Sequence, residues 1–205
     1  MQTCHALRAI TAITAVVVLL GACGPTGTQV SRVDPSTDID LSGNWNAGDN
    51  RRVANWMVES STQGAWLRRF QEQSNRLPAI QLSRVEVISS GDIINTTAFL
   101  NAIRNAFINS GKATVVATLA EAELTREILA DQDLHASDDT RREQFQETGT
   151  DFILHGRITI QDDQAGRRRV KMYYVDLSLT NVETRQQVWA DRKEIMKDVQ
   201  VGRYR

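Results

Sequence analysis

The chain has 205 residues and carries 24 Lys and Arg against 25 Asp and Glu, a formal net charge of −1 at neutral pH. A nucleic-acid-binding domain would need a marked excess of basic residues, so this balance argues against such a partner. The length suits one domain with a substantial core, plus a tail.

The first 22 residues predict a bacterial lipoprotein signal peptide. An apolar run from Ala9 to Leu20 follows Arg8. It is long enough for a signal-peptide core and shorter than the ~20 residues that span a bilayer as a helix. The run ends in Leu20-Gly21-Ala22-Cys23, the lipobox pattern, in which small residues suit the signal peptidase and the thiol accepts diacylglycerol. The alternatives are an ordinary secretory signal with an incidental cysteine and a buried helix.

Lipid on Cys23 has consequences for chemistry and location. Cys4 and Cys23 are the only cysteines, so the processed chain would have no free thiol, and we predict no disulfide and no cysteine metal site. More than one fatty chain, at about 0.8 kcal/mol per buried methylene, gives stable anchoring. Gly24 rather than Asp follows the cysteine. In the sorting rule that the lipobox pattern implies, this favours the outer membrane, with the folded part facing the periplasm.

Residues 23–40 are the predicted lipidated N-terminus and flexible tether. They are rich in Gly, Pro, Thr, Ser and Asp and show no helical or strand period. At ~5–6 Å × √n their average reach is about 20–25 Å. Residues 41–205 form the predicted domain.

The first half of the domain predicts helix, strand, helix and strand. Asp49 is the expected N-cap of a helix over residues 50–75 that is interrupted near Gly64, and Ile80–Ile88 is the first strand. Asn95 begins the next helix, which ends at Gly111 and places these residues on one face: Phe99, Ile103, Ala106 and Phe107. A short strand over 113–117 completes a βαβ unit with parallel strands.

The second half predicts two more helices and an antiparallel meander. Thr118 and Glu121 form a capping box for a helix to about Ala130, with Leu124 and Ile128 as core anchors. Another, surface helix is expected from Ser137 to Gly149. Strands follow over 151–161, 169–180 and 187–195, with turns at 162–166 and 181–186. We predict a single α/β domain whose mixed sheet of about five strands is flanked by about four helices.

The sequence offers no positive sign of catalysis. It contains neither a Gly-rich phosphate loop nor a GxSxG elbow. His135 lies in a predicted acid-rich, solvated linker, beside Asp131, Asp133, Asp138 and Asp139. We do not expect a metal site there, because ligands for hard metals need convergent spacing. His155 is predicted to be a partly buried packing residue in a strand. We therefore predict no enzyme activity, no cofactor and no metal.

Two further features admit a binding and a structural interpretation. Arg167-Arg168-Arg169 is the densest positive charge. It is either a partner-binding knob or the charged guard of an edge strand, balanced by Asp162 and Asp163 across the turn. Trp45 and Trp66 are either recognition aromatics or, the favoured interpretation, core or staple residues.

Five stretches, taken in order and spacing, carry a family resemblance: the lipobox at Cys23, Asp40-Leu41-Ser42-Gly43-Asn44-Trp45-Asn46, Asn95-Thr96 to Ser110-Gly111-Lys112, Gly149-Thr150-Asp151-Phe152-Ile153-Leu154-His155-Gly156, and Val182-Glu183-Thr184 to Val188-Trp189. Together they resemble the LpoB-type lipoproteins over nearly all of residues 40 to 196. These are outer-membrane activators of class A penicillin-binding proteins, with a domain similar to the N-terminal domain of TolB. The best-known members have a long Pro-rich tether, whereas residues 24–40 contain two prolines.

The resemblance implies a regulator without catalysis. The domain would reach through the peptidoglycan layer, dock on a small accessory domain of the synthase and raise its glycosyltransferase and transpeptidase activities. No interface residue is carried over. The alternative hypothesis is an envelope structural or export accessory lipoprotein that uses the same domain for assembly.

Overall fold

The computed structural model describes residues 31–34, 37, 39–40, 42–89, 91–135 and 148–200. The chain divides into two units, Met1–Thr37 and Asp38–Arg205, and every described helix and strand belongs to the second. The predicted signal peptide and Cys23 lie outside the described residues, as does most of the helix predicted from Ser137 to Gly149. Among the described residues, no helix is both long enough and apolar enough to cross a membrane.

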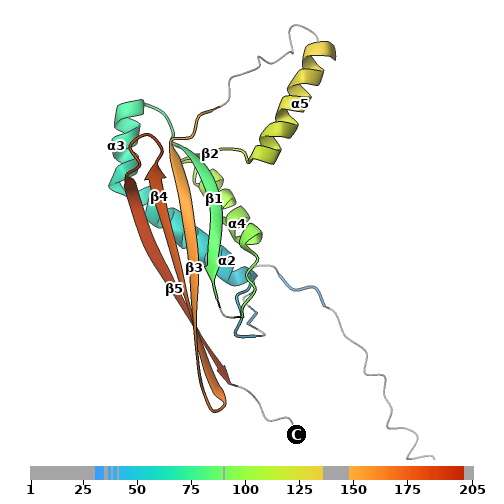
Figure 1. Ribbon diagram of the computed structural model, residues 1–205, viewed down its shortest axis with the longest axis vertical. Coiled ribbons are helices and arrows are strands. Elements are labelled where there is room, and N and C mark those ends of the chain that lie inside the picture. The colour runs from blue at the N-terminus through green and yellow to red at the C-terminus, as the bar shows by residue number, and fades with distance from the viewer. Residues whose placement is uncertain are drawn as a thin grey trace, which may run out of the picture. The chain divides into compact units, whose positions relative to one another are not determined.

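The second unit alternates helices and strands and then ends in three long strands (Figure 1). The described elements are α2 (Ala47–Gln63), α3 (Ala65–Ser74), β1 (Ala79–Ile88), α4 (Thr96–Ser110), β2 (Thr114–Val115), α5 (Leu119–His135), β3 (Phe152–Ala165), β4 (Arg168–Asn181) and β5 (Gln187–Gln200).

These strands form one mixed sheet in the order β2-β1-β3-β4-β5. β1 pairs in parallel with β2 and β3, whereas β3, β4 and β5 pair antiparallel. The predicted βαβ unit followed by a meander is therefore confirmed. The predicted strand over 113–117 is shorter than expected, because only Thr114 and Val115 pair with β1.

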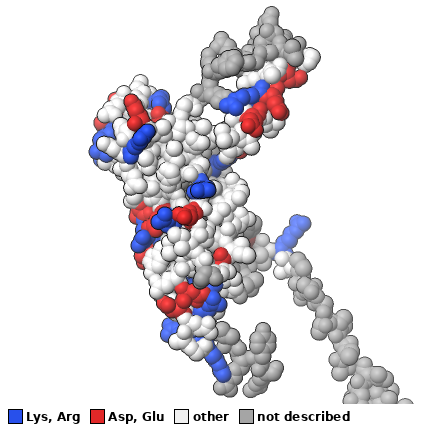
Figure 2. Space-filling model, viewed as in Figure 1, with Lys and Arg blue, Asp and Glu red and all other residues white. Residues whose placement is uncertain are grey.

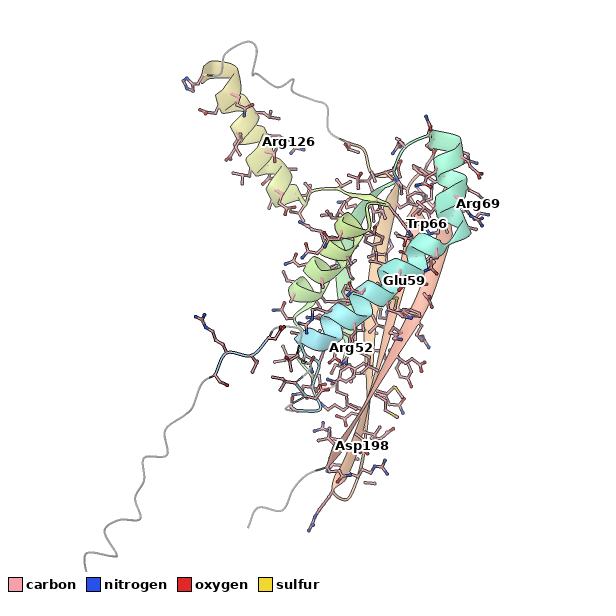
Figure 3. The ribbon with its side chains drawn as sticks, turned by 180° about the vertical axis from the view of Figure 1, so that it is seen from behind. Arg52, Glu59, Trp66, Arg69, Arg126 and Asp198 are labelled. Carbon is pink, nitrogen blue, oxygen red and sulfur yellow. The ribbon has the colours of Figure 1, made fainter. Side chains whose placement is uncertain are left out.

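The helices α2 and α4 cover one face of the sheet. They pack against each other, α2 also contacts β5, and α4 also contacts β1 and β2. Figure 3 looks at this covered face, and Figure 1 at the opposite one. In the part of the chain that the structure describes, no helix covers the opposite face, where His155 and Arg157 are exposed.

The hydrophobic core lies between the sheet and these helices. Strict alternation turns every second residue of the long strands toward the helices, and these side chains are buried: Phe152, Leu154, Ile158, Tyr173, Val175, Leu177 and Leu179. They meet Phe99, Ile103 and Phe107 of α4, as the helical spacing predicted. Each large apolar side chain buried in this way contributes roughly 1.5–3 kcal/mol.

The tryptophans are packing residues, as favoured from the sequence. Trp66 is buried with its ring centroid 4.9 Å from that of Phe152, at a steep angle. Trp45 lies 5.9 Å from Phe99 and 5.5 Å from Tyr173, measured between ring centroids. Both therefore anchor chain segments onto the sheet.

The predicted cap of the first helix is wrong by three residues. α2 begins at Ala47, and its N-cap is Asn46, whose side chain accepts a hydrogen bond from the Asp49 backbone N–H at 3.0 Å. Asp49 instead closes the capping box by accepting the Asn46 N–H at 3.0 Å. The predicted interruption at Gly64 is confirmed, because α2 ends at Gln63 and α3 begins at Ala65.

The helix α5 departs from expectation in its length and in its apolar side chains. Its predicted capping box is present, with the Thr118 N–H donating to Glu121 Oε2 at 2.7 Å, and Arg104 of α4 also contacts Glu121 at 2.6 Å. These donors lower the pKa of Glu121 to about 2. The helix continues to His135, and the predicted anchors Leu124 and Ile128 are 58% and 49% exposed, so they are not core residues.

The first turn of the meander is tighter than predicted. Ala165 pairs directly with Arg168, so only Gly166 and Arg167 form the loop, and Gly166 has φ +60°. A positive φ at the first position of a two-residue hairpin suits glycine. The edge-strand interpretation of Arg167–Arg169 is wrong, because β4 lies between β3 and β5. The expected charge balance is present in part: Arg169 Nε donates to Asp162 at 2.7 Å, whereas Asp163 accepts from Gln161 and Arg168 pairs with Asp198 of β5 at 3.0 Å.

Truncation of Phe107 should strongly destabilise the fold. Its side chain is 1% exposed in the centre of the core, so we expect Phe107→Ala to lower the free energy of unfolding by about 3–5 kcal/mol. Asn101→Ala, an exposed change on the same helix, is the matched control and should change it by less than about 0.5 kcal/mol. Urea denaturation of both variants measures the difference. Equal midpoints would contradict the assigned helix face.

Candidate functional site

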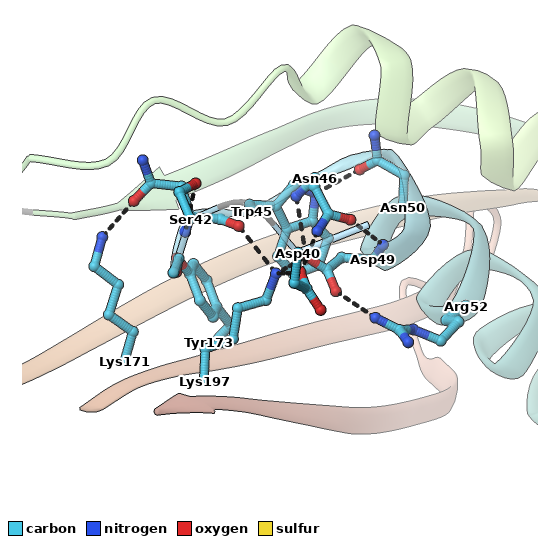
Figure 4. A network of polar contacts seen from close by, with 12 residues as sticks. Asp40, Ser42, Trp45, Asn46, Asp49, Asn50, Arg52, Lys171, Tyr173 and Lys197 are labelled. Atoms are coloured by element: carbon cyan, nitrogen blue, oxygen red, sulfur yellow. Dashed lines mark hydrogen bonds and ion pairs between the residues drawn. The ribbon is translucent and has the colours of Figure 1, made fainter. Parts of the chain in front are cut away.

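Two lysines lie directly opposite each other on the covered face of the sheet. Lys171 of β4 and Lys197 of β5 are register partners, and Lys171 is 3% exposed. Like charges facing each other across two strands repel, and burial of an ammonium group is costly without a partner. This placement of the two lysines is therefore stable only with carboxylates from other segments of the chain (Figure 4).

Lys197 receives its acids from the N-terminal end of the domain. Its Nζ donates to Asp49 Oδ2 at 2.6 Å, to Asp40 Oδ1 at 2.8 Å and to the Asn44 carbonyl oxygen at 2.9 Å. Burial alone would lower the pKa of Lys197, but the two carboxylates outweigh burial and hold the pKa above its ordinary value. Asp49 is fully buried and also accepts a hydrogen bond from Arg52 at 2.8 Å.

Lys171 is held by the segment before α2 and by the loop before α4. Its Nζ donates to Asn44 Oδ1 and to Asp92 Oδ1, both at 2.6 Å. Burial would raise the pKa of Asp92, yet hydrogen bonds from Lys171 and Tyr173 outweigh it and keep this pKa below its ordinary value. Burial and the neighbouring Asp92 raise the pKa of Tyr173, so its hydroxyl stays protonated.

The residues before α2 wrap closely over these lysines. Tyr173 Oη lies 2.9 Å from the Gly43 carbonyl oxygen, and Trp45 Nε1 donates to Asn50 Oδ1 at 2.6 Å. A β-carbon on Gly43 would overlap Val199 Cγ2, so only glycine fits here without a shift. We call Asp40, residues 42–46, Lys171 and Lys197 the N-terminal clasp. It fixes the point at which the chain enters the domain.

The opposite, uncovered face of the sheet displays ordered cross-strand rows of side chains. One row runs Glu86, Arg157, Asp176 and Arg192, one residue from each of β1, β3, β4 and β5. Glu86 pairs with Arg157 at 3.0 Å, and Asp176 pairs with Arg192 at 2.7 Å. We call this row the charge ladder. Figure 2 shows charged side chains gathered across the middle of this face.

A groove of about 990 Å³ lies over the charge ladder and the row beside it. Here the β1–β3 register shifts, because Leu82 pairs with Leu154 but Val85 pairs with Gly156. Ser83 and Arg84 of β1 therefore stand opposite the single residue His155, as in a β-bulge. All three side chains line the groove, together with Ser178 of β4 and Gln187 of β5.

An apolar area adjoins the charge ladder on the same face. Tyr174 and Met172 of β4 follow Asp176, Met196 pairs with Met172, and Ile88 of β1 extends the row of Tyr174. Met196 is 66% and Ile88 is 46% exposed. The Arg192 guanidinium lies 5.5 Å from the Tyr174 ring centroid and joins this area to the ladder. Exposed Met, Tyr and Arg beside paired charges are the usual composition of a protein interface.

The structure places the two histidines at separate points. His155 is exposed in the groove, so its predicted role as a partly buried packing residue is wrong. The physical reason is that its face of the strand has no helix over it. His135 ends α5 rather than lying in a linker, with Nε2 3.8 Å from Asp131. No group of three or more His, Cys, Asp or Glu among the described residues could hold a metal ion.

The charge ladder and the groove were not predicted from the sequence. A row across four strands depends on their register, which the residues of any single strand do not reveal. The bulge at Ser83 and Arg84 left no recognisable signal, since the run Ile80–Ile88 looks continuous. The N-terminal clasp did give a signal, the stretch Asp40–Asn46, although its role was not predicted.

The fold defines a single α/β domain with a mixed five-stranded sheet and one covered face. A family model described as the peptidoglycan-synthase activator LpoB matches residues 49–195, and the chain belongs to this family. The family is one of regulators that activate a synthase.

The solved structures that match this chain have low sequence identity to it. The LpoB C-terminal domain from Escherichia coli is 16% identical, with a TM-score of 0.42, and the match covers 72% of this chain and 98% of that one. The same domain from Salmonella enterica is 16% identical, with a TM-score of 0.41, and the match covers 72% of this chain and 98% of that one. Lipoprotein GNA1162 from Neisseria meningitidis is 18% identical, with a TM-score of 0.39, and the match covers 59% of this chain and 83% of that one. A search of curated proteins finds no match.

A methyl group on Gly43 should loosen the N-terminal clasp. Gly43→Ala forces Val199 or the backbone to move, so we expect a loss of about 1–3 kcal/mol in the free energy of unfolding. In a Val199→Ala background, which makes room, the same substitution should cost clearly less. Thermal denaturation of the four chains in this double-mutant cycle measures the coupling. Additive effects would show that Gly43 does not pack on Val199.

Proposed function

We propose that this protein is an outer-membrane lipoprotein that binds and activates a class A penicillin-binding protein from the periplasmic side. The observation that carries this proposal is membership of the LpoB family over residues 49–195. The lipobox at Cys23 supplies the anchor, and Gly24 after it favours the outer membrane.

The uncovered sheet face is the proposed docking surface for the synthase. It combines an apolar area with a charge ladder whose members are already paired, so binding does not leave buried charges without partners. The N-terminal clasp lies on the other side of the sheet, because Lys171 and Lys197 point toward the helices.

Activation in this proposal is a matter of differential binding. The domain raises synthase activity only if it binds the active conformation of the synthase more tightly than the inactive one. The ratio of these two affinities sets how far the equilibrium between the conformations shifts. In this proposal the domain acts by binding alone, and the chemical steps belong to the synthase. The tether raises the local concentration of the domain near its partner, with an average reach of about 20–25 Å.

Loss of the Cys23 thiol should abolish anchoring. The sulfur is the proposed lipid acceptor, so Cys23→Ser should lose incorporation of labelled palmitate and no longer fractionate with the outer membrane. Cys4→Ser, which alters the other cysteine of the precursor, should retain both properties. Normal labelling and fractionation of Cys23→Ser would rule out the lipobox interpretation.

The protein without its lipid should still stimulate a synthase in solution. We expect residues 23–205 carrying Cys23→Ser to bind a class A penicillin-binding protein of the same organism and to raise its rate of glycan polymerisation. The stimulation should saturate with occupancy and be unaffected by EDTA. A monofunctional transpeptidase from the same organism is the control and should not bind. The proposal fails if no class A synthase is bound, and the envelope-assembly hypothesis then takes its place.

A further inference from the structure

Arg84 differs from the other arginines that line the groove. Arg157 and Arg192 are each paired with a carboxylate of the charge ladder. Arg84 is exposed, and its guanidinium has no hydrogen bond or ion pair with any residue that the structure describes. The register shift between Leu82 and Val85 places it in the groove, opposite His155. Bulges of this kind redirect a side chain at functional positions.

The groups around Arg84 are hydrogen-bonding side chains of small or moderate size. Ser83 precedes it, and His155, Ser178 and Gln187 line the same groove. Ser178 and Gln187 lie farther across the groove, on β4 and β5, whereas the Ser83 hydroxyl and the His155 ring are close to Arg84 in the strand register. Arg binds carboxylates in a planar, bidentate way, and these two neighbours can add donors to the same group.

The charge ladder limits what this part of the groove can accept. Glu86 and Asp176 lie one row away, so a polyanion such as a run of phosphates would meet like charges. A single carboxylate at Arg84 avoids them. The apolar area at Tyr174, Met172 and Met196 lies beyond the ladder and suits aliphatic side chains rather than a sugar chain.

We propose that Arg84 is the anchor of the docking surface and receives an Asp or Glu side chain of the synthase, while an apolar side chain of the same partner covers Met172 and Met196. This inference rests on the proposed function and adds the chemistry that the partner must present. Arg84 contributes specificity and orientation, because a paired charge beside an apolar contact fixes register.

The test compares charge variants at one position in residues 23–205 carrying Cys23→Ser. Binding to the class A synthase is measured by titration calorimetry. Arg84→Glu should weaken binding at least tenfold, Arg84→Lys should weaken it less, and Arg84→Gln should reduce the dependence of the Kd on salt. Arg68→Glu is the matched control, because Arg68 is an exposed arginine on α3 with no described partner, and it should leave the Kd unchanged. Equal melting temperatures confirm that all variants fold.

The possible outcomes separate this inference from the proposed function. If the unsubstituted protein binds and Arg84→Glu binds as tightly, the anchor is wrong while the function stands. If the unsubstituted protein binds no class A synthase, both are overturned. A third arm measures co-sedimentation with purified peptidoglycan sacculi. Sedimentation that is lost in Arg84→Glu would assign the carboxylate to the cell wall and overturn the inference. Met196→Glu should weaken binding to the synthase. An unchanged Kd would overturn the proposed apolar contact over Met172 and Met196.

Discussion

The fold depends on the neutralisation of two buried lysines that face each other across β4 and β5. Lys171 and Lys197 would repel each other if other segments of the same chain did not supply carboxylates. These carboxylates come from three separate segments, at Asp40, Asp49 and Asp92. The distal end of the hairpin, the start of α2 and the loop before α4 therefore order together. Removal of one partner from such a buried pair typically costs more than the pair contributes, which makes the cluster decisive for specificity.

The N-terminal clasp and the charge ladder lie on opposite faces of the same sheet. The chain enters on the side of α2, where Gly43 packs on Val199 and Asn44 binds Lys171. The uncovered face, with its charge ladder, lies on the opposite side of the same strands. The thickness of the sheet therefore separates the residues that hold the start of the domain from those of the groove.

Local signals predicted much of the fold, and they failed where tertiary contacts decide. The caps at Asn95 and Thr118 and the alternation of β3 and β4 were correct because they depend on neighbours in sequence. The residue type of Asp49 suits a cap, but Asn46 is the N-cap and Asp49 stands at the third position of the helix, where it completes the capping box and also accepts a hydrogen bond from Lys197. Leu124 and Ile128 have core spacing without a described surface over them. His155 shows the same limit, because alternation assigns a residue to a face but does not tell which face the helices cover.

An uncovered sheet face beside a 14-residue edge strand is a liability that the charge ladder reduces. The paired charges of the ladder keep the centre of this face polar. In the proposed complex, a partner that presents a carboxylate gains a pairing with Arg84. Because the ladder is internally neutral, its paired charges add little affinity of their own, and in the proposed complex discrimination falls to Arg84.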